Sequence, residues 1–520
     1  MKIYKYISII LLASSTLFFV QCTDAYDRYN KTGVNDEEGE RDAYFLRQHL
    51  VNMQNWVVPS NPWAHQFTEQ LLGGPYGRYF TDVNPGFNNK NFATYTPTDA
   101  WSATTFNNAM TNVVTSYNTI VAMTDDPVLL SVAKVLKVMV LSRIIDIYGP
   151  IPYTQLSSEG NLNAPYDSQQ VVYETMISEL NEAIEALTEN QTSDFSSKAD
   201  RFYTGETLKW IKLANSLKLR LAIRMADVNT PFAQATAESV ITDAIGPMTS
   251  NDDNAVLILI SGQSNPYQLG MSDWNGGDSR ISADITSYMN GYNDPRMEKY
   301  FDESSFGGYI GFRSGVTIPN PQAANQQYSN MNTSLRTASS MRIMCAAEVA
   351  FLKAEGALRG WGMGGMAKDF YEEGITLSFN QNGVSGAGTY IADNTSTPQR
   401  YTDPLFPSFS YFGTMSSIKI AWDSSASYET NLERIITQKW IAIYPDGVEA
   451  WSEFRRTGYP KLMPVQVNNS SVVSTTRMVR RLRYPNSEYT GNLTNVQYAV
   501  SNYLGGVDNM ATDLWWAKKN

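Results

Sequence analysis

The chain has 520 residues, of which 42% are hydrophobic, so it is long and apolar enough to bury a large core and is not a disordered chain. Its formal net charge of −11 argues against a nucleic acid as the main partner, because phosphate binding requires a basic surface. Only two histidines occur, with no cysteine cluster around them, so neither a zinc site nor a histidine-based catalytic triad is expected. Aromatic residues make up 12% of the chain; their flat apolar faces with polar edges suit sugars and peptides, although many will simply fill the core.

The first 21 residues have the pattern of a secretory signal peptide. Two lysines near the start precede an apolar run over 9–20, which is too short and wrongly flanked for a membrane-spanning helix. We therefore expect residues 1–21 to direct export and to be removed.

Cys22 stands where the apolar run ends, and this position resembles the lipobox of bacterial lipoproteins, whose cysteine thiol is acylated. Gln21 departs from the small residue usual before that cysteine, and the alternative is a chance cysteine after an ordinary signal. After Cys22 only Cys345 remains, so a lipidated chain could form no intramolecular disulfide. Several acyl chains would give stable membrane anchoring. We expect residues 22–40 to be the lipidated N-terminus and a polar tether, and 41–520 to form a single domain.

Apolar residues spaced three and four apart predict helices in most of that domain. In chain order they cover 107–123, 130–148, 168–188, 205–227, 341–360, 367–379, 432–444 and 447–456. Asp126 and Pro127 form a helix-start signal, and Gly149 with Pro150 forms a stop. The pairing of helices of similar size predicts a mostly α fold of about four tetratricopeptide-like helix pairs, with an irregular helical bundle as the alternative.

Long turn-rich regions separate the helices. The helical scaffold is expected at about 104–245 and 341–460, with irregular, aromatic-rich loops at about 60–101 and 261–340 and further turn-rich stretches at 381–429 and 463–519. Loops of such length are usually functional or disordered, and the aromatic content argues against disorder.

No motif of an enzyme is present. The chain lacks a G-x-S-x-G elbow, a P-loop and H-E-x-x-H, so no catalytic residue, metal or cofactor is expected. Glu348 and Glu355 lie seven apart on one helix face and could in principle be a glycosidase pair, but ion pairing between helices is favoured. The segment "NDDN" at 251–254 could offer oxygen ligands to calcium, but it lacks EF-hand spacing and is better explained as a turn.

The segment "QKWIAIYPDGVEAWSEFRRTGYPK" at 438–461 is the densest in aromatic and charged residues. It predicts two helices joined by a turn at Pro445-Asp446-Gly447. Arg455 and Arg456 are expected to fork onto carboxylates such as Glu449 or Glu433 and to stack on tryptophans. We therefore interpret this segment as structural.

Five segments together resemble the SusD/RagB family. "AKVLKVMVLSRIIDIYGPIPYTQ" is similar to that family's helix followed by "YGDIPY", with Pro150 at the position where the family commonly has Asp. "GYNDPRMEKYF", "AAEVAFLKAEGALRGW", the segment at 438–461 and "RLRYPNSEYTGN" resemble further signatures, in order from about 130 to 492.

The resemblance implies a surface-exposed lipoprotein of the outer membrane of Bacteroidota. Members are mostly helical, bind glycans or in some cases peptides, are not enzymes, and close as a lid over a TonB-dependent transporter of the SusC type. A peptide-capturing lid, a lipid-anchored glycoside hydrolase and a pure protein-binding scaffold remain as alternatives.

In this family the ligand surface comes from the variable loops. On that basis the ligand-binding candidates are Tyr76, Tyr79 and Trp101 in the first loop region and Trp274, Asn275, Asp278, Tyr309, Phe312 and Arg313 in the second. Aromatic faces would stack on sugar rings, and the polar side chains would bind hydroxyl groups.

Overall fold

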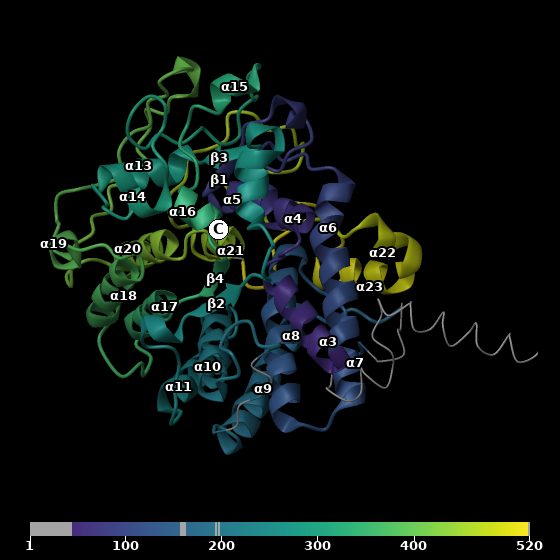
Figure 1. The fold of residues 1–520 in the computed structure, drawn as a ribbon. Helices are drawn as coiled ribbons and strands as arrows, with labels where there is room; N and C mark the ends of the chain where they lie inside the picture. The colour runs from purple at the N-terminus through teal and green to yellow at the C-terminus, as the bar shows by residue number, and fades with distance from the viewer. Residues whose placement is uncertain (1–43, 157–162, 193–194, 196–197, 518–520) are drawn as a thin grey trace, which may run out of the picture. The chain divides into compact units, whose positions relative to one another are not determined.

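A computed structural model describes residues 44–156, 163–192, 195 and 198–517 (Figure 1). The predicted signal peptide, Cys22 and the tether lie outside the described residues. The described chain is mostly helical with few strands, which confirms the predicted fold class. The tetratricopeptide-like character of the helix pairs remains a prediction.

The larger helices form the body of the fold. They are α3 (Tyr44–Val57), α6 (Asp99–Ala109), α7 (Thr115–Met123), α8 (Pro127–Tyr148), α9 (Gln169–Glu189), α10 (Thr207–Arg224), α11 (Thr230–Thr242), α13 (Ala283–Gly291), α17 (Ala346–Leu358), α18 (Ala367–Gln381), α20 (Tyr428–Ala442), α21 (Gly447–Thr457) and α23 (Leu493–Tyr503). Shorter ones are α4 (Pro62–His65), α5 (Gly74–Gly77), α12 (Pro266–Gln268), α14 (Met297–Tyr300), α15 (Gln322–Asn325), α16 (Thr333–Arg336), α19 (Ala387–Ile391) and α22 (Asn486–Gly491).

Helix α8 shows how local sequence sets an element. Asp126 accepts hydrogen bonds from the backbone N–H groups of Val128 (2.9 Å) and Leu129 (3.4 Å), and Pro127 occupies the first turn. Gly149 ends the helix at φ 90°, a conformation that favours glycine. The predicted start and stop of this helix are confirmed. Because α8 is apolar almost all round, it is buried against neighbouring helices, among them α9.

The first loop region is more helical than its composition indicates. Gln66–Gly73 forms a π-helical segment between α4 and α5, and Pro62 and Pro75 each stand in a first helical turn, where proline is tolerated. Helix α6 begins at Asp99, because the Thr98 side chain accepts a hydrogen bond from the N–H of Trp101 (3.3 Å). The predicted start at 107 is therefore wrong, and Trp101 lies in a first helical turn.

The predicted helix over 341–360 is wrong at its start. Ser340–Met344 is a strand, β4, that pairs antiparallel with β2 (Ala255–Ile258), and the helix begins only at Ala346. The alternating residues of "SMRIM" carry the period of two that a half-buried strand requires. Helix α11 was not predicted at all.

A second small sheet joins the two loop regions. Strand β1 (Phe80–Asp82) pairs antiparallel with β3 (Ser279–Ile281), with Phe80 opposite Ile281. The N–H of Val83 continues the ladder to the carbonyl of Asp278 (2.9 Å). Segments some 200 residues apart in the chain are thereby held side by side.

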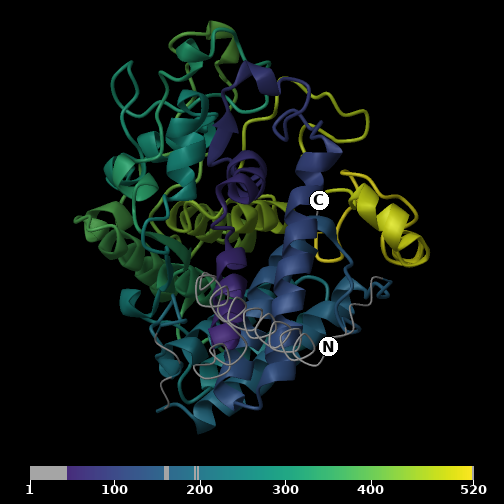
Figure 2. The ribbon, with the colours of Figure 1, turned by 45° about the vertical axis from the view of Figure 1, so that its right-hand side comes forward.

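The C-terminal helices α22 and α23 lie beside α6, as both views show (Figures 1 and 2). The hydroxyl of Ser487 in α22 is 3.2 Å from the side-chain oxygen of Asn107 in α6.

The start of α21 approaches another backbone so closely that only glycine fits. A Cβ atom on Gly447 would lie 2.3 Å from the carbonyl carbon and oxygen of Gly73. Because the obstacle is backbone, we expect Gly447→Ala to lower the free energy of unfolding by about 3 kcal/mol or more. Gly388→Ala in α19 is the matched control, since nothing lies within 4 Å of its Cβ position, and it should leave the protein as stable or slightly more stable. Urea unfolding of both variants measures the difference; equal stabilities would contradict the close approach.

Candidate ligand-binding site

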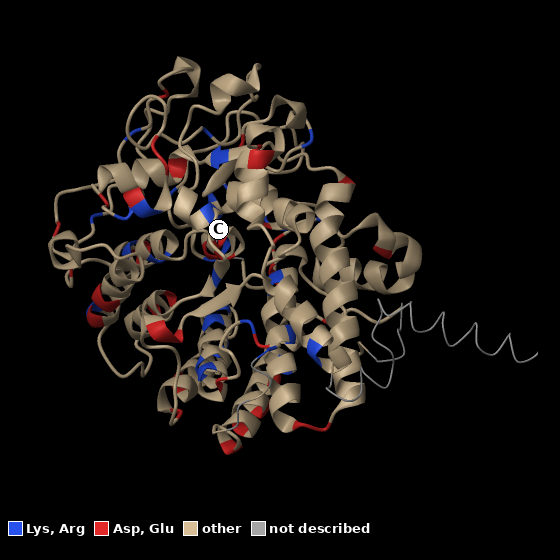
Figure 3. Ribbon diagram, in the orientation of Figure 1, with Lys and Arg blue, Asp and Glu red and all other residues tan. Residues whose placement is uncertain are grey.

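A buried cluster of charged side chains lies where helices α20 and α21 meet. In Figure 3, acidic and basic positions lie close together in this part of the ribbon. The ammonium of Lys439 lies 2.9 Å from Glu449 and 3.5 Å from Glu453, and Arg224 of α10 lies 2.5 Å from Glu453. Burial alone would lower the pKa of Lys439, but the surrounding glutamates outweigh burial and raise it. The cluster therefore holds its charges, and it joins α10 to the α20–α21 pair.

The two arginines of α21 differ in their partners. Arg456 forks onto both carboxylate oxygens of Glu355 in α17 at 2.6 Å and also reaches Glu453 at 2.7 Å. The guanidinium of Arg455 stacks 3.5 Å from the ring centroid of Trp451 and donates to backbone carbonyls. The predicted stacking is confirmed, but the predicted carboxylate partners of the two arginines, Glu449 and Glu433, are wrong. The reason is that α17, distant in sequence, presents Glu355 to α21.

The paired glutamates of α17 are not arranged as a glycosidase pair. Glu348 is bound by Arg220 at 2.8 and 2.6 Å, and Glu355 by Arg456 and Arg359. Both carboxylates are 1% exposed, so they face the interior and not a cleft. Ion pairing between helices accounts for both residues.

The "NDDN" segment forms a short 3-10 turn closed by its own side chains. Asp253 accepts hydrogen bonds from the backbone N–H groups of Thr249 (3.0 Å) and Ser250 (3.1 Å) and from Lys212 (2.7 Å). Its carboxylate is therefore engaged within the fold.

Five of the predicted ligand residues are packed inside the protein. Tyr76 lies against Trp451 with ring centroids 4.7 Å apart, and Tyr79 stacks on Trp440 at 5.7 Å. Phe312, 0% exposed, packs edge-on against Tyr328. Since these rings have no solvent-accessible face, their prediction as ligand contacts is wrong.

The two polar residues among the five are also buried. Asp278 accepts hydrogen bonds from the side chains of Gln66 (3.0 Å), Asn84 (2.7 Å) and Asn275 (2.9 Å), so it fixes the β1–β3 junction. Arg313 is 2% exposed and donates to the carbonyl of Pro464. Both were predicted as ligand contacts, and both instead serve the packing of the loops.

The remaining candidates keep some exposed surface. Trp101 is half-buried against Phe67 and Phe87, with ring centroids 4.9 and 5.1 Å away. Trp274 and Tyr309 are half-buried and Asn275 is exposed. Ligand binding by these residues stays a prediction.

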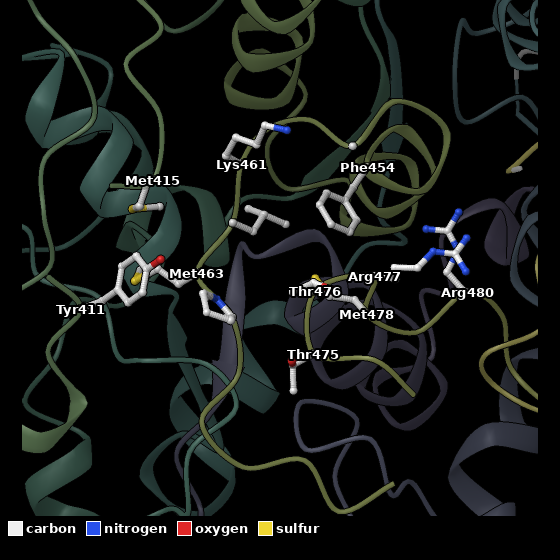
Figure 4. Close-up of a pocket in the computed structure, with 13 residues that line it drawn as sticks. Tyr411, Met415, Phe454, Lys461, Met463, Thr475, Thr476, Arg477, Met478 and Arg480 are labelled. Atoms are coloured by element: carbon white, nitrogen blue, oxygen red, sulfur yellow. The ribbon is translucent and has the colours of Figure 1, made fainter. Parts of the chain in front are cut away.

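A cavity of about 460 Å³ opens between two loops that follow the scaffold helices (Figure 4). Its walls come from the end of α21 and from the segments around 411–415, 461–464 and 475–480. They comprise Tyr411, Met415, Phe454, Gly458, Lys461, Leu462, Met463, Pro464, Thr475, Thr476, Arg477, Met478 and Arg480. We refer to this cavity as the loop pocket.

The scaffold holds the loop pocket in shape. Gly458 ends α21 at φ 78°, which turns the chain into the pocket wall. The N–H of Met463 donates to Asp284 (2.7 Å) and the hydroxyl of Tyr288 donates to the carbonyl of Lys461 (2.8 Å), both from α13. These bonds tie the wall to α13, so the pocket is preformed.

The pocket combines an aromatic face with polar groups. Tyr411 is half-buried, and the Arg313 guanidinium lies 5.0 Å from its ring centroid. Thr475 and Thr476 bring hydroxyls, and Lys461 and Arg477 bring N–H donors. A mixed lining of this kind, with few convergent polar groups, is typical of small-molecule sites.

Sequence reasoning missed the residues of the loop pocket. The stretches 381–429 and 463–519 were recognised as turn-rich, but no residue in them was selected. A signal was present: Tyr411 follows two phenylalanines in a loop, and Lys461 stands in the short turn after the predicted last helix pair, which ends at 456.

Comparison with known proteins settles the family. A family model described as "Susd and RagB outer membrane lipoprotein" matches residues 28–517. The chain belongs to the SusD/RagB family. SusD-like proteins are nutrient-binding lipoproteins of the outer membrane and not enzymes. A search of curated proteins found no match.

Solved SusD homologues share the fold of this SusD-like chain. One from Bacteroides uniformis is 42% identical, with a TM-score of 0.87 over 92% of this chain and 100% of its own. One from Bacteroides thetaiotaomicron is 41% identical, with a TM-score of 0.85 over 91% and 99%. A chitin-binding SusD homologue from Flavobacterium johnsoniae is 37% identical, with a TM-score of 0.87 over 91% and 99%.

The Glu355–Arg456 pair gives a testable contribution to stability. Burial alone would raise the pKa of Glu355, but Arg456 and Arg359 outweigh it and hold that pKa at about 2. Glu355→Gln should therefore lower the free energy of unfolding at pH 7 by about 3–5 kcal/mol, because two buried guanidiniums lose a compensating charge. Since the folded pKa lies below the unfolded value of about 4.3, this stabilisation is present above pH ~4.5 and is lost as the pH falls toward 2.

Urea unfolding at pH 7, 4.5 and 3 measures the effect. The matched control is Glu372→Gln, whose partner Lys368 is 3.8 Å away near the surface; it should change stability by less than about 0.5 kcal/mol. Equal losses in the two variants at pH 7 would contradict the assignment.

Proposed function

We propose that this protein captures an oligosaccharide at the cell surface and acts as the lid of a SusC-like TonB-dependent transporter. Membership of a family of nutrient-binding outer-membrane lipoproteins carries the proposal. The binding of chitin by a relative 37% identical over nearly its full length favours a glycan over a peptide as the cargo.

The loop pocket supports the same conclusion on physical grounds. Its volume of about 460 Å³ lies within the range of about 300–1,000 Å³ usual for small-molecule sites. A sugar ring would stack on Tyr411, and its hydroxyls would exchange hydrogen bonds with Thr475 and Thr476.

Anchoring by Cys22 completes the proposed arrangement. A lipid on Cys22 would hold the protein at the outer membrane, with the segment 22–40 as a tether. Among the described residues, no helix is long and apolar enough to cross a membrane.

Removal of the pocket's aromatic face tests the site. We expect Tyr411→Ala to weaken oligosaccharide binding by about 1–2 kcal/mol, because the stacking face is lost. Isothermal titration with chito-oligosaccharides and a panel of other glycans measures it. Tyr498→Ala, at a tyrosine 55% exposed on α23, is the control and should bind as the unaltered protein does.

The same titration tests the loop candidates. If Trp274→Ala abolishes binding while Tyr411→Ala does not, the ligand binds at the 261–340 loops and the loop pocket is not the site. Binding of peptides but of no glycan would contradict the proposed cargo.

The anchor has its own test. Cys22→Ala should leave the protein folded, as judged by circular dichroism, but move it from the outer-membrane fraction to the soluble fraction. Retention in the membrane would refute the lipid anchor. Affinity purification of the solubilised, unaltered protein should recover a TonB-dependent transporter.

A further inference from the structure

The loop pocket is lined by basic residues and by no acidic one. Lys461, Arg477 and Arg480 contribute to its walls, and none of the thirteen lining residues is Asp or Glu. Figure 4 shows Lys461 on one side and the guanidinium groups of Arg477 and Arg480 on another. This is the opposite of the whole chain, in which 51 acidic residues outnumber 40 basic ones.

The two arginines share a single carboxylate. Asp513 lies 2.8 Å and 3.0 Å from Arg477 and 2.6 Å from Arg480, and it lies outside the pocket lining. One negative charge therefore faces two positive charges, so the two arginines and Asp513 together carry a net charge of about +1.

Lys461 adds a second positive charge to the pocket wall. Its side chain is exposed, and its ammonium lies 4.6 Å from the ring centroid of Tyr459. No carboxylate within the described part of the chain lies within 4 Å of this ammonium. Two glutamates lie near the same tyrosine: Glu429, which accepts a hydrogen bond from the Tyr459 hydroxyl (3.2 Å), and Glu433; neither belongs to the pocket lining.

A further cation lies behind the aromatic wall. The Arg313 guanidinium stacks on Tyr411, while Asp284, the acid in that neighbourhood, lies 4.0 Å from Arg78 and accepts the N–H of Met463. Asp284 is therefore shared between Arg78 and Arg313, so one negative charge faces two positive charges on this side.

We infer that the loop pocket selects acidic oligosaccharides, bearing carboxylate or sulfate groups, over neutral ones. The inference rests on the proposed function and specifies its substrate class. An anionic group that reaches Lys461 or Arg477 forms charge-assisted hydrogen bonds, whereas a neutral hydroxyl gains much less there. A sugar ring would at the same time keep its stacking on Tyr411.

The test is a comparison of three oligosaccharides of equal length by isothermal titration at 50 mM and 300 mM NaCl. They are an oligogalacturonate, a sulfated oligosaccharide without carboxylates and a neutral chito-oligosaccharide. We expect one or both acidic probes to bind at least about tenfold more tightly than the neutral one at low salt, with the advantage reduced at high salt.

Two variants with opposite expected effects exclude general damage to the fold. Lys461→Met should weaken binding of the acidic probe about fivefold, the effect of one unit charge at about 4 Å in a water-like dielectric. Asp513→Asn should strengthen it, because the two arginines lose their neutralising partner. Neither should change the binding of a neutral probe more than about twofold.

Lys209→Met is the control of equal charge change. Lys209 pairs with Glu206 at the start of α10, and no residue of α10 lines the loop pocket. It should leave binding of every probe unchanged.

The outcomes separate this inference from the proposed function. If the neutral probe binds as tightly as the acidic ones and neither variant has an effect, the inferred selectivity is wrong while glycan capture stands. If no oligosaccharide of any kind binds, the proposed function fails and the inference fails with it.

Discussion

The fold depends on a network of buried charges between helices that are far apart in sequence. Lys439 and Arg224 meet Glu449 and Glu453, and Arg456 forks onto Glu355. Removing these groups from water costs several kcal/mol each, and only close partners with further hydrogen bonds offset that cost. Every member is therefore required to be in place at once, so the network fixes how α10, α17, α20 and α21 meet.

This rigid centre carries the loops that form the site. The turn between α20 and α21 places Gly447 against the backbone of Gly73, and Trp440 and Trp451 pack against tyrosines of the first loop region. Tyr76 and Tyr79, which the sequence offers as ligand contacts, therefore pack between the scaffold helices and the loops. Buried flat rings give large apolar contact area at fixed geometry, which suits that role. The ligand surface is left to the segments outside this contact.

The charge of the loop pocket differs in sign from the net charge of the whole chain. A net charge of −11 repels anions at long range, but within a Debye length of about 8 Å the local cations of the loop pocket dominate. A cavity with low-dielectric walls strengthens that local field. An acidic glycan would thus be held only when it enters the pocket, which confines its recognition to the site.

The sequence by itself determined the mostly helical class, the bounds of α8 and α9 and the family, because periodicity, capping and local motifs are written in neighbouring residues. It also determined the structural role of the two helices within 438–461, but not that Lys461 at the end of that segment lines a pocket. Strand β4 was not predicted, because a short strand is stable only when it pairs with its partner, β2. The helical turns within 60–101 were not predicted either, because short turns that begin at a proline are stable only when they are buried. The ligand residues depended most on tertiary structure. Composition cannot distinguish a tyrosine such as Tyr76, packed on Trp451, from one such as Tyr411, which faces a cavity. Exposure is decided by which distant segments meet, and only the folded chain brings 411–415, 461–464 and 475–480 together around one pocket.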